Sequence, residues 1–151
     1  MTTKILSILN IVILCLIVFV VSVFFVENAQ LIGFILVGLS VLCIVSLIPF
    51  GIKVKSIQPD IMFGIIDNGI LAIMAIVGGH FAGVAGAIIG GVVGNAITDA
   101  IAGIFEGYSA EKLRTNNINE ERTIIKSAVG KMAGCLLGAG VVLIFSGLMR
   151  F

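Results

Sequence analysis

Residues 78–107 read GGHFAGVAGAIIGGVVGNAITDAIAGIFEG. This stretch is long, apolar and free of proline, which predicts a membrane-spanning helix with a short hairpin turn before it. Small side chains recur at a spacing of four residues in two neighbouring stripes, so one side of the helix has almost no bulk. In lipid, such stripes let two helix backbones approach closely. We therefore expect helix packing at Gly79, Gly83, Gly86, Gly90 and Gly94.

Polar side chains interrupt the apolar span. Asn95 and Asp99 lie on one of the two small stripes, and Thr98 lies on the other. An ionisable group at this depth costs several kcal/mol unless it has partners or water. Helix packing explains the glycines, but it does not explain Asp99.

The composition agrees with a membrane protein. The chain has 151 residues, of which 60% are hydrophobic and 11% charged, and its mean hydropathy is +1.27. It is long enough for one small all-α, polytopic helix bundle. The net charge of +1 gives no reason to expect a nucleic-acid partner. The three cysteines stand singly in separate apolar segments, as small buried side chains do.

We expect five transmembrane helices within a single integral membrane domain, 1–151. Pro49 and Gly51 end the second apolar run, and Pro59 with Asp60 begins the third. The first run could also be a signal peptide, but it is long and no cleavage site follows it. The expected spans are about 5–26, 31–50, 60–79, 82–105 and 127–149, and the last carries its own small row at Gly130, Gly134 and Gly138.

A polar or amphipathic cytoplasmic segment, 107–126, precedes the last span. It could be an interfacial helix, an extension of the fourth span or a loop. Within it, Asn119 followed by Glu120 and Glu121 is typical of a helix N-cap with an acidic first turn.

Basic residues set the expected orientation. With a cytoplasmic N-terminus, five spans place almost every lysine and arginine on the cytoplasmic side. Only Arg150 then lies outside. We therefore expect an integral protein of a bacterial-type inner or plasma membrane with its C-terminus outside. The cytoplasmic basic residues would be Lys4, Lys53, Lys55, Lys112, Arg114, Arg122, Lys126 and Lys131.

Helical rise predicts that several polar side chains share one depth. Asp67 precedes His80 at the hairpin tip and Asn95 follows it by similar numbers of residues, so both lie roughly 20 Å from the tip. Gly64 and Thr98 would leave room around the carboxylates. The expected ion pathway comprises Asp67, Asn68, Asn95, Thr98 and Asp99.

Carboxylate and amide oxygens suit hard cations or a proton relay. We expect Asp67 and Asp99 to bind the ion, with Glu106 as a further metal ligand near the cytoplasmic face. No cofactor is expected other than a bound divalent cation. The alternative is that the two aspartates are protonated or hydrogen-bonded to neighbouring polar groups and serve only to hold helices together.

Residues 60–109 resemble the first hairpin of the vacuolar iron transporter family. The resemblance lies in Asp67-Asn68-Gly69, in the run Gly83-Val-Ala-Gly86-Ala, and in Glu106-Gly107-Tyr108-Ser109. It implies a dimer in which Asp67 lies on the path of a divalent cation and Glu106 marks the cytoplasmic mouth. Here, however, two expected spans precede the hairpin, whereas the family places its hairpin first.

These observations favour a small cation transporter or channel, with a divalent metal preferred, working as a homo-oligomer in the bilayer. A dimer would pack two copies of the row from Ala82 to Ala102. The alternative is a non-transporting assembly protein: a scaffold, a holin-like oligomer or an accessory subunit of a membrane complex. Catalysis has little support, because no catalytic triad can be placed at a common depth, so we expect no enzyme.

Overall fold

The computed structural model describes residues 2–28, 30–115 and 123–149, with the side chains of 4–28, 30–104 and 123–149. Its elements are α1 (Thr2–Phe25), α2 (Ile32–Val45), the short 3-10 turns η1 (Ile48–Phe50) and η2 (Val54–Ser56), α3 (Gln58–Thr115) and α4 (Ile124–Met149). The described residues contain no strand, which confirms the all-α prediction. Within the described part of the chain, four helical stretches are long and apolar enough to cross a membrane: Lys4–Phe25, Ile32–Phe50, Gln58–Ile104 and Ile124–Met149.

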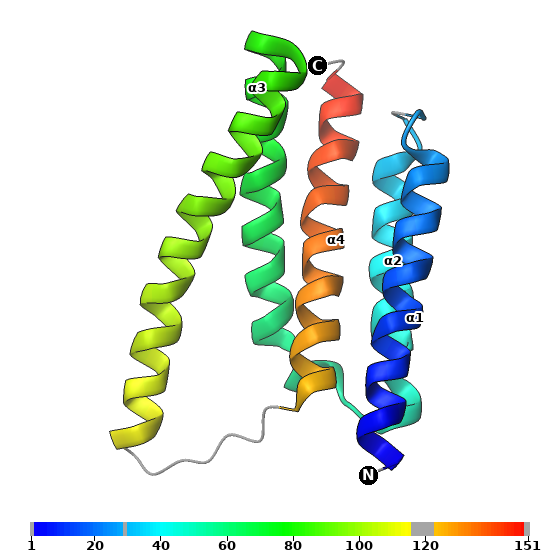
Figure 1. Ribbon diagram of the computed structural model, residues 1–151, viewed down its shortest axis with the longest axis vertical. Coiled ribbons are helices and arrows are strands. Elements are labelled where there is room, and N and C mark those ends of the chain that lie inside the picture. The colour runs from blue at the N-terminus through cyan, green and yellow to red at the C-terminus, as the bar shows by residue number, and fades with distance from the viewer. Residues whose placement is uncertain (1, 29, 116–122, 150–151) are drawn as a thin grey trace. The chain divides into compact units, whose positions relative to one another are not determined.

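Helix α3 reverses its direction at two residues. Ala82 (φ −138°, ψ 25°) and Gly83 (φ 58°, ψ −139°) leave the helical conformation, and Figure 1 shows the resulting turn. Only glycine adopts the backbone angles of Gly83 without strain. We call residues 58–81 the first arm of α3 and residues 84–115 the second arm. The second arm continues through the beginning of the predicted polar segment, whereas residues 116–122 lie outside the described part of the chain.

The chain forms two compact units. One comprises Met1–Gly69 with Ile124–Phe151, and we call it the bundle unit. The other comprises Ile70–Thr123, and we call it the hairpin unit.

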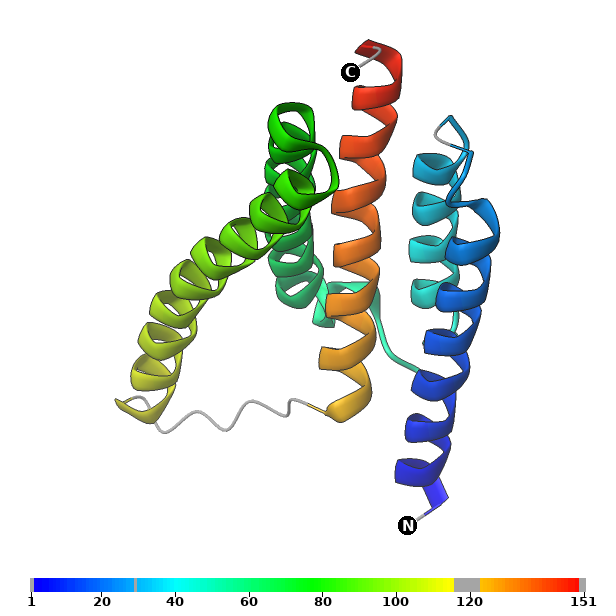
Figure 2. The same ribbon diagram turned by 45° about the horizontal axis from the view of Figure 1, so that its top comes forward.

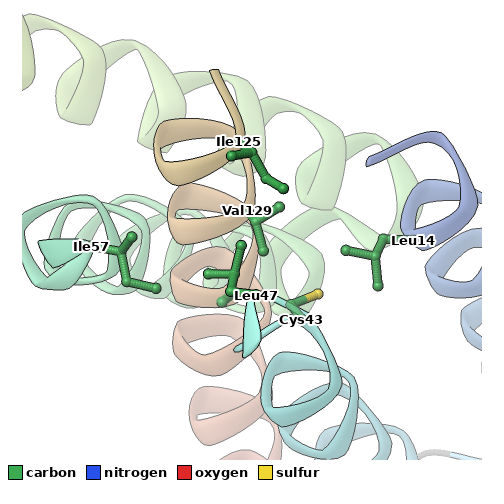
Figure 3. Close-up of a cluster of buried hydrophobic side chains, with 7 residues drawn as sticks. Leu14, Cys43, Leu47, Ile57, Ile125 and Val129 are labelled. Carbon is green, nitrogen blue, oxygen red and sulfur yellow. The ribbon is translucent and has the colours of Figure 1, made fainter. Parts of the chain in front are cut away.

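An apolar cluster holds the bundle unit together (Figure 3). It lies at the end of the unit where α2 meets the start of α4, and α1 contributes one side chain. Beside it, the buried Ser40 hydroxyl donates a hydrogen bond of 2.7 Å to the carbonyl oxygen of Ala133. The buried members are Leu14, Cys43, Leu47, Ile57, Ile125, Val129 and Ala133.

Glycines let the helices of the bundle unit approach closely. Helix α2 runs antiparallel to α4, as Figure 2 also shows, and a Cβ on Gly33 would lie 2.9 Å from the carbonyl oxygen of Gly140. The first arm of α3 packs on another stripe of α4. A Cβ on Gly134 would overlap the carbonyl oxygen of Ile61, and a Cβ on Gly138 would overlap that of Ile65.

The first arm of α3 and α4 therefore run parallel, because contact positions increase together along both. At the start of the interface, a Cβ on Gly130 would lie 2.9 Å from the Cβ of Asp60. The contact is reciprocal, since a Cβ on Gly64 would lie 2.6 Å from the amide nitrogen of Cys135. The sequence predicted that Gly64 leaves room near the carboxylates. That space is instead filled by the backbone of α4.

The hairpin unit uses the other glycine row. The arms of α3 touch where Gly86 meets Gly78, where Gly90 meets the carbonyl of Met74, and where a Cβ on Gly94 would lie 3.1 Å from the Cα of Leu71. Gly79 is a looser contact, facing the side chain of Ala87. Gly83 has open space around it and serves the turn instead of helix packing.

Candidate ion site

The structure divides the predicted ion-pathway residues between the two units. Asp67 and Asn68 belong to the bundle unit, whereas Asn95, Thr98 and Asp99 belong to the hairpin unit. All five lie on α3. Each group is therefore described within its own unit.

Asn95 and Asp99 form a polar pair on the second arm. They are one helical turn apart, and the Asn95 side-chain amide donates a hydrogen bond of 2.8 Å to the Asp99 carboxylate. Asp99 is exposed and Asn95 is half-buried. Their neighbours Val92, Val93 and Ile97 are exposed apolar side chains. The carboxylate thus stands on a largely apolar helix, with a neutral amide as its hydrogen-bonding partner.

Thr98 has a local role. Its side chain is only 3% exposed, and its hydroxyl donates to the carbonyl oxygens of Gly94 (3.2 Å) and Asn95 (3.0 Å) of its own helix. A hydroxyl bonded in this way is satisfied without an ion or another helix. Thr98 therefore contributes to the buried stripe of the hairpin, next to Gly94, and not to the exposed polar pair.

Asp67 lies on the face of the first arm that meets α4. Phe63 precedes it by four residues and so lies on the same face of the helix. On the opposing side, Lys131 and Cys135 are also four residues apart on α4. The Lys131 ammonium lies 4.6 Å from the centre of the Phe63 ring. The Cys135 thiol is within electrostatic range of both the Asp67 and Lys131 charges.

Lys131 was not predicted as a site residue from the sequence. Its charge places it among the expected cytoplasmic basic residues, but α4 begins at Ile124, so the backbone of Lys131 lies about 10 Å along the helix. Its half-buried side chain rests on Phe63 and not in open solvent. A lysine two turns inside an apolar span, facing a helix with an aspartate, was the available signal.

A second carboxylate is buried at the start of α3. Asp60 is only 4% exposed, and the Ser127 hydroxyl donates to it over 3.3 Å. It lies in the first turn of α3, where the helix dipole favours a negative charge. The sequence marked Asp60 as a helix start but gave no sign that α4 would cover it. Its contacts indicate a structural role in joining α3 to α4.

An apolar groove of about 320 Å³ runs along the hairpin unit. Its walls include Met74, Val77, Phe81, Ile89 and Val93, with glycines of both arms at its base. Phe81 is 83% exposed at the tip. The side chains that line the groove carry no oxygen ligands, and neither Asn95 nor Asp99 is among them.

Among the side chains that the structure describes, no three His, Cys, Asp or Glu residues converge as a metal site. The predicted ligand Glu106 has its backbone in the second arm, but its side chain lies outside the described part.

No family model, curated protein or solved structure matches this chain. Its function is therefore inferred from the geometry of its own residues.

Proposed function

We propose that the protein is a small membrane transporter or channel for a cation, with Asp67 and Asp99 as its two acidic positions. One observation carries this proposal: the Asp99 carboxylate lies exposed on an apolar helix with a neutral amide as its partner. In hydrocarbon such a group is costly, and intramembrane carboxylates commonly belong to ion or proton pathways. Asn95 would supply a neutral oxygen beside it.

Packing direction supports five crossings. The first arm of α3 and α4 are parallel, so both start on the same side of the bilayer. The chain between residues 81 and 124 must then return across the membrane, and the second arm of α3 is apolar and long enough to do so. With α1 and α2 this gives five crossings, and the distribution of basic residues favours a cytoplasmic N-terminus and an outside C-terminus.

Internal packing weakens the assembly alternative. That reading rests on the glycine rows, which primarily predict association between helices. Gly86, Gly90 and Gly94 already pack within the hairpin, and Gly134 and Gly138 pack within the bundle unit. The rows are thus accounted for by packing inside one chain.

A homodimer remains part of the proposal, but through a different surface. The row from Ala82 to Ala102 is the one that faces the first arm. The neighbouring stripe carries Asn95, Asp99 and Gly103, and a Cβ on Gly103 would meet no atom within 4 Å. A second copy packed there would shield both polar side chains from lipid.

The test is cation flux into liposomes that contain the purified protein, for Na⁺, K⁺, Mg²⁺, Ca²⁺, Mn²⁺ and Fe²⁺, with a proton-sensitive dye. We expect Asp67→Asn and Asp99→Asn each to lower flux at least about tenfold, equivalent to about 1.4 kcal/mol. Expression and oligomer size should not change. Glu27→Gln is the matched control, because Glu27 is exposed in the turn after α1.

Undiminished flux in both aspartate variants would overturn the proposal. No flux from well-folded wild-type protein would instead favour the assembly alternative. In that case Gly90→Leu should disrupt the complex and neutral replacements of the acids should not.

A further inference from the structure

We propose that Lys131 is a built-in counter-cation for Asp67, and that its ammonium restricts this site to singly charged cargo, a proton or a monovalent cation. The inference rests on the proposed function and names the class of its cargo. It departs from the divalent preference predicted from sequence, which rested on the oxygen ligands and did not include Lys131.

Backbone contacts place Asp67 and Lys131 along the same seam, within about two helical turns of each other. The backbone of Gly64 lies against Lys131 and Cys135 of α4, and Asp67 follows Gly64 by less than one turn. Side chains in a helix lean toward its N-terminus. Asp67 therefore leans back toward the level of Phe63, whose ring the Lys131 ammonium contacts.

Side-chain positions agree with the backbone. The Lys131 ammonium lies 4.6 Å from the centre of the Phe63 ring, which fixes it on the face of the first arm that also carries Asp67. Cys135, one turn beyond Lys131, experiences the charges of both residues. The half-buried carboxylate and ammonium thus share their surroundings with two further half-buried residues, Phe63 and Cys135.

The charge balance decides the cargo. A carboxylate and an ammonium together are neutral, so the pair is stable in a low-dielectric site without a bound ion. A cation that enters must separate the two charges and remain near the ammonium. With the ammonium present, a singly charged ion leaves a net charge of +1 in the site and a doubly charged ion leaves +2. The cost of an uncompensated charge in a low-dielectric site rises with the square of that charge. The ring of Phe63 can hold the displaced ammonium.

Asp99 provides the internal contrast. Its hydrogen-bonding partner is the neutral Asn95, so it carries no such discrimination by charge. Selectivity between one and two positive charges is therefore expected from Asp67 and Lys131.

The experiment measures the ratio of divalent to monovalent flux in liposomes for wild type, Lys131→Gln, Lys131→Arg and Lys126→Gln. Lys126 is the matched control, since it is half-buried in the first turn of the same helix. We expect Lys131→Gln to raise the ratio at least about tenfold, and Lys131→Arg and Lys126→Gln to leave it unchanged. An unchanged ratio in Lys131→Gln, with flux still dependent on Asp67, overturns the inference and leaves the proposed function intact.

A second measurement tests the pairing without transport. Thermal unfolding in detergent is compared for Asp67→Asn, Lys131→Gln and the double variant. Each single variant should lower the melting temperature, because it strands one charge, and the double variant should be more stable than either. Additive losses overturn the pairing. No flux for any cation overturns the proposed function and the selectivity together.

Discussion

Two interfaces in this protein are built on glycine rows, and they differ in what surrounds the glycines. Between the first arm of α3 and α4, Gly134 and Gly138 receive the backbone of Ile61 and Ile65, and Gly64 fits back against α4. Buried and half-buried polar groups lie along the same seam. Between the two arms of α3, Gly86 meets Gly78 directly and a groove of about 320 Å³ stays open beside them.

The contrast shows that a glycine row fixes how closely two backbones approach, but not how well the interface is filled. Filling depends on the large side chains that flank the row. The bundle unit supplies them as an apolar cluster. In the hairpin unit, the large side chains of Phe81 and Ile89 are instead exposed. We therefore expect the bundle unit to be the more stable of the two.

The largest effect is expected from overfilling the interface between α3 and α4. Gly134→Leu should destabilise by at least about 3 kcal/mol, because the atoms in its way are backbone atoms of Ile61 that cannot rotate aside. Gly90→Leu should cost less, since the arms of the hairpin can separate into the groove. Thermal unfolding in detergent measures both.

The matched control for these variants is Gly69→Leu, because a Cβ on this glycine meets nothing within 4 Å. It should unfold close to wild type. If the melting temperature of Gly134→Leu is no lower than that of Gly69→Leu, the close contact between Gly134 and Ile61 of α3 is wrong.

A smaller effect is expected at the turn of α3. Gly83→Ala forces a side chain into backbone angles that strongly favour glycine, which should cost about 1–3 kcal/mol. The loss should be confined to the hairpin unit. Maleimide labelling of Cys43, which is fully buried in the bundle unit, should keep its wild-type rate. Faster labelling would mean that the turn also supports the bundle.

The smallest effect is expected at the seam between α2 and α4. Ser40→Ala removes a buried hydroxyl that bonds the Ala133 carbonyl over 2.7 Å. Hydrogen bonds between membrane helices average about 0.6 kcal/mol, so the melting temperature should fall slightly and Cys43 should label faster. Ser56→Ala is the control, because its hydroxyl bonds an exposed local carbonyl. Equal behaviour of the two variants would contradict a role for Ser40 in this seam.

Local features of the fold could be predicted from the sequence. Pro59 and Asp60 stand in the first turn of α3, and the reversal lies two residues beyond the predicted hairpin tip. Hydropathy revealed the apolar helices because it depends on each segment alone. These features depend on residues that are close together in the chain, which is why they can be predicted from the sequence.

Which helices pack against each other could not be predicted in this way. The row at Gly130, Gly134 and Gly138 was visible, but nothing local indicates that Ile57–Ile65 would cover it. The same applies to the candidate site, where Lys131 meets Phe63 across two helices that are far apart in the chain. The distribution of charges along the sequence does not indicate which helix a side chain rests on, so the contact of Lys131 with Phe63 could not be predicted.

The parallel contact between α3 and α4 joins two segments that are synthesised at different times. Gly64 and Gly134 touch, yet 70 positions separate them along the chain. At about 5–20 residues per second, a ribosome needs roughly 4–14 s to make the second partner after the first. During that interval the first arm is in the membrane without α4, and the hairpin is the neighbour already made. The hairpin can therefore form early, before Lys131 of α4 has been synthesised.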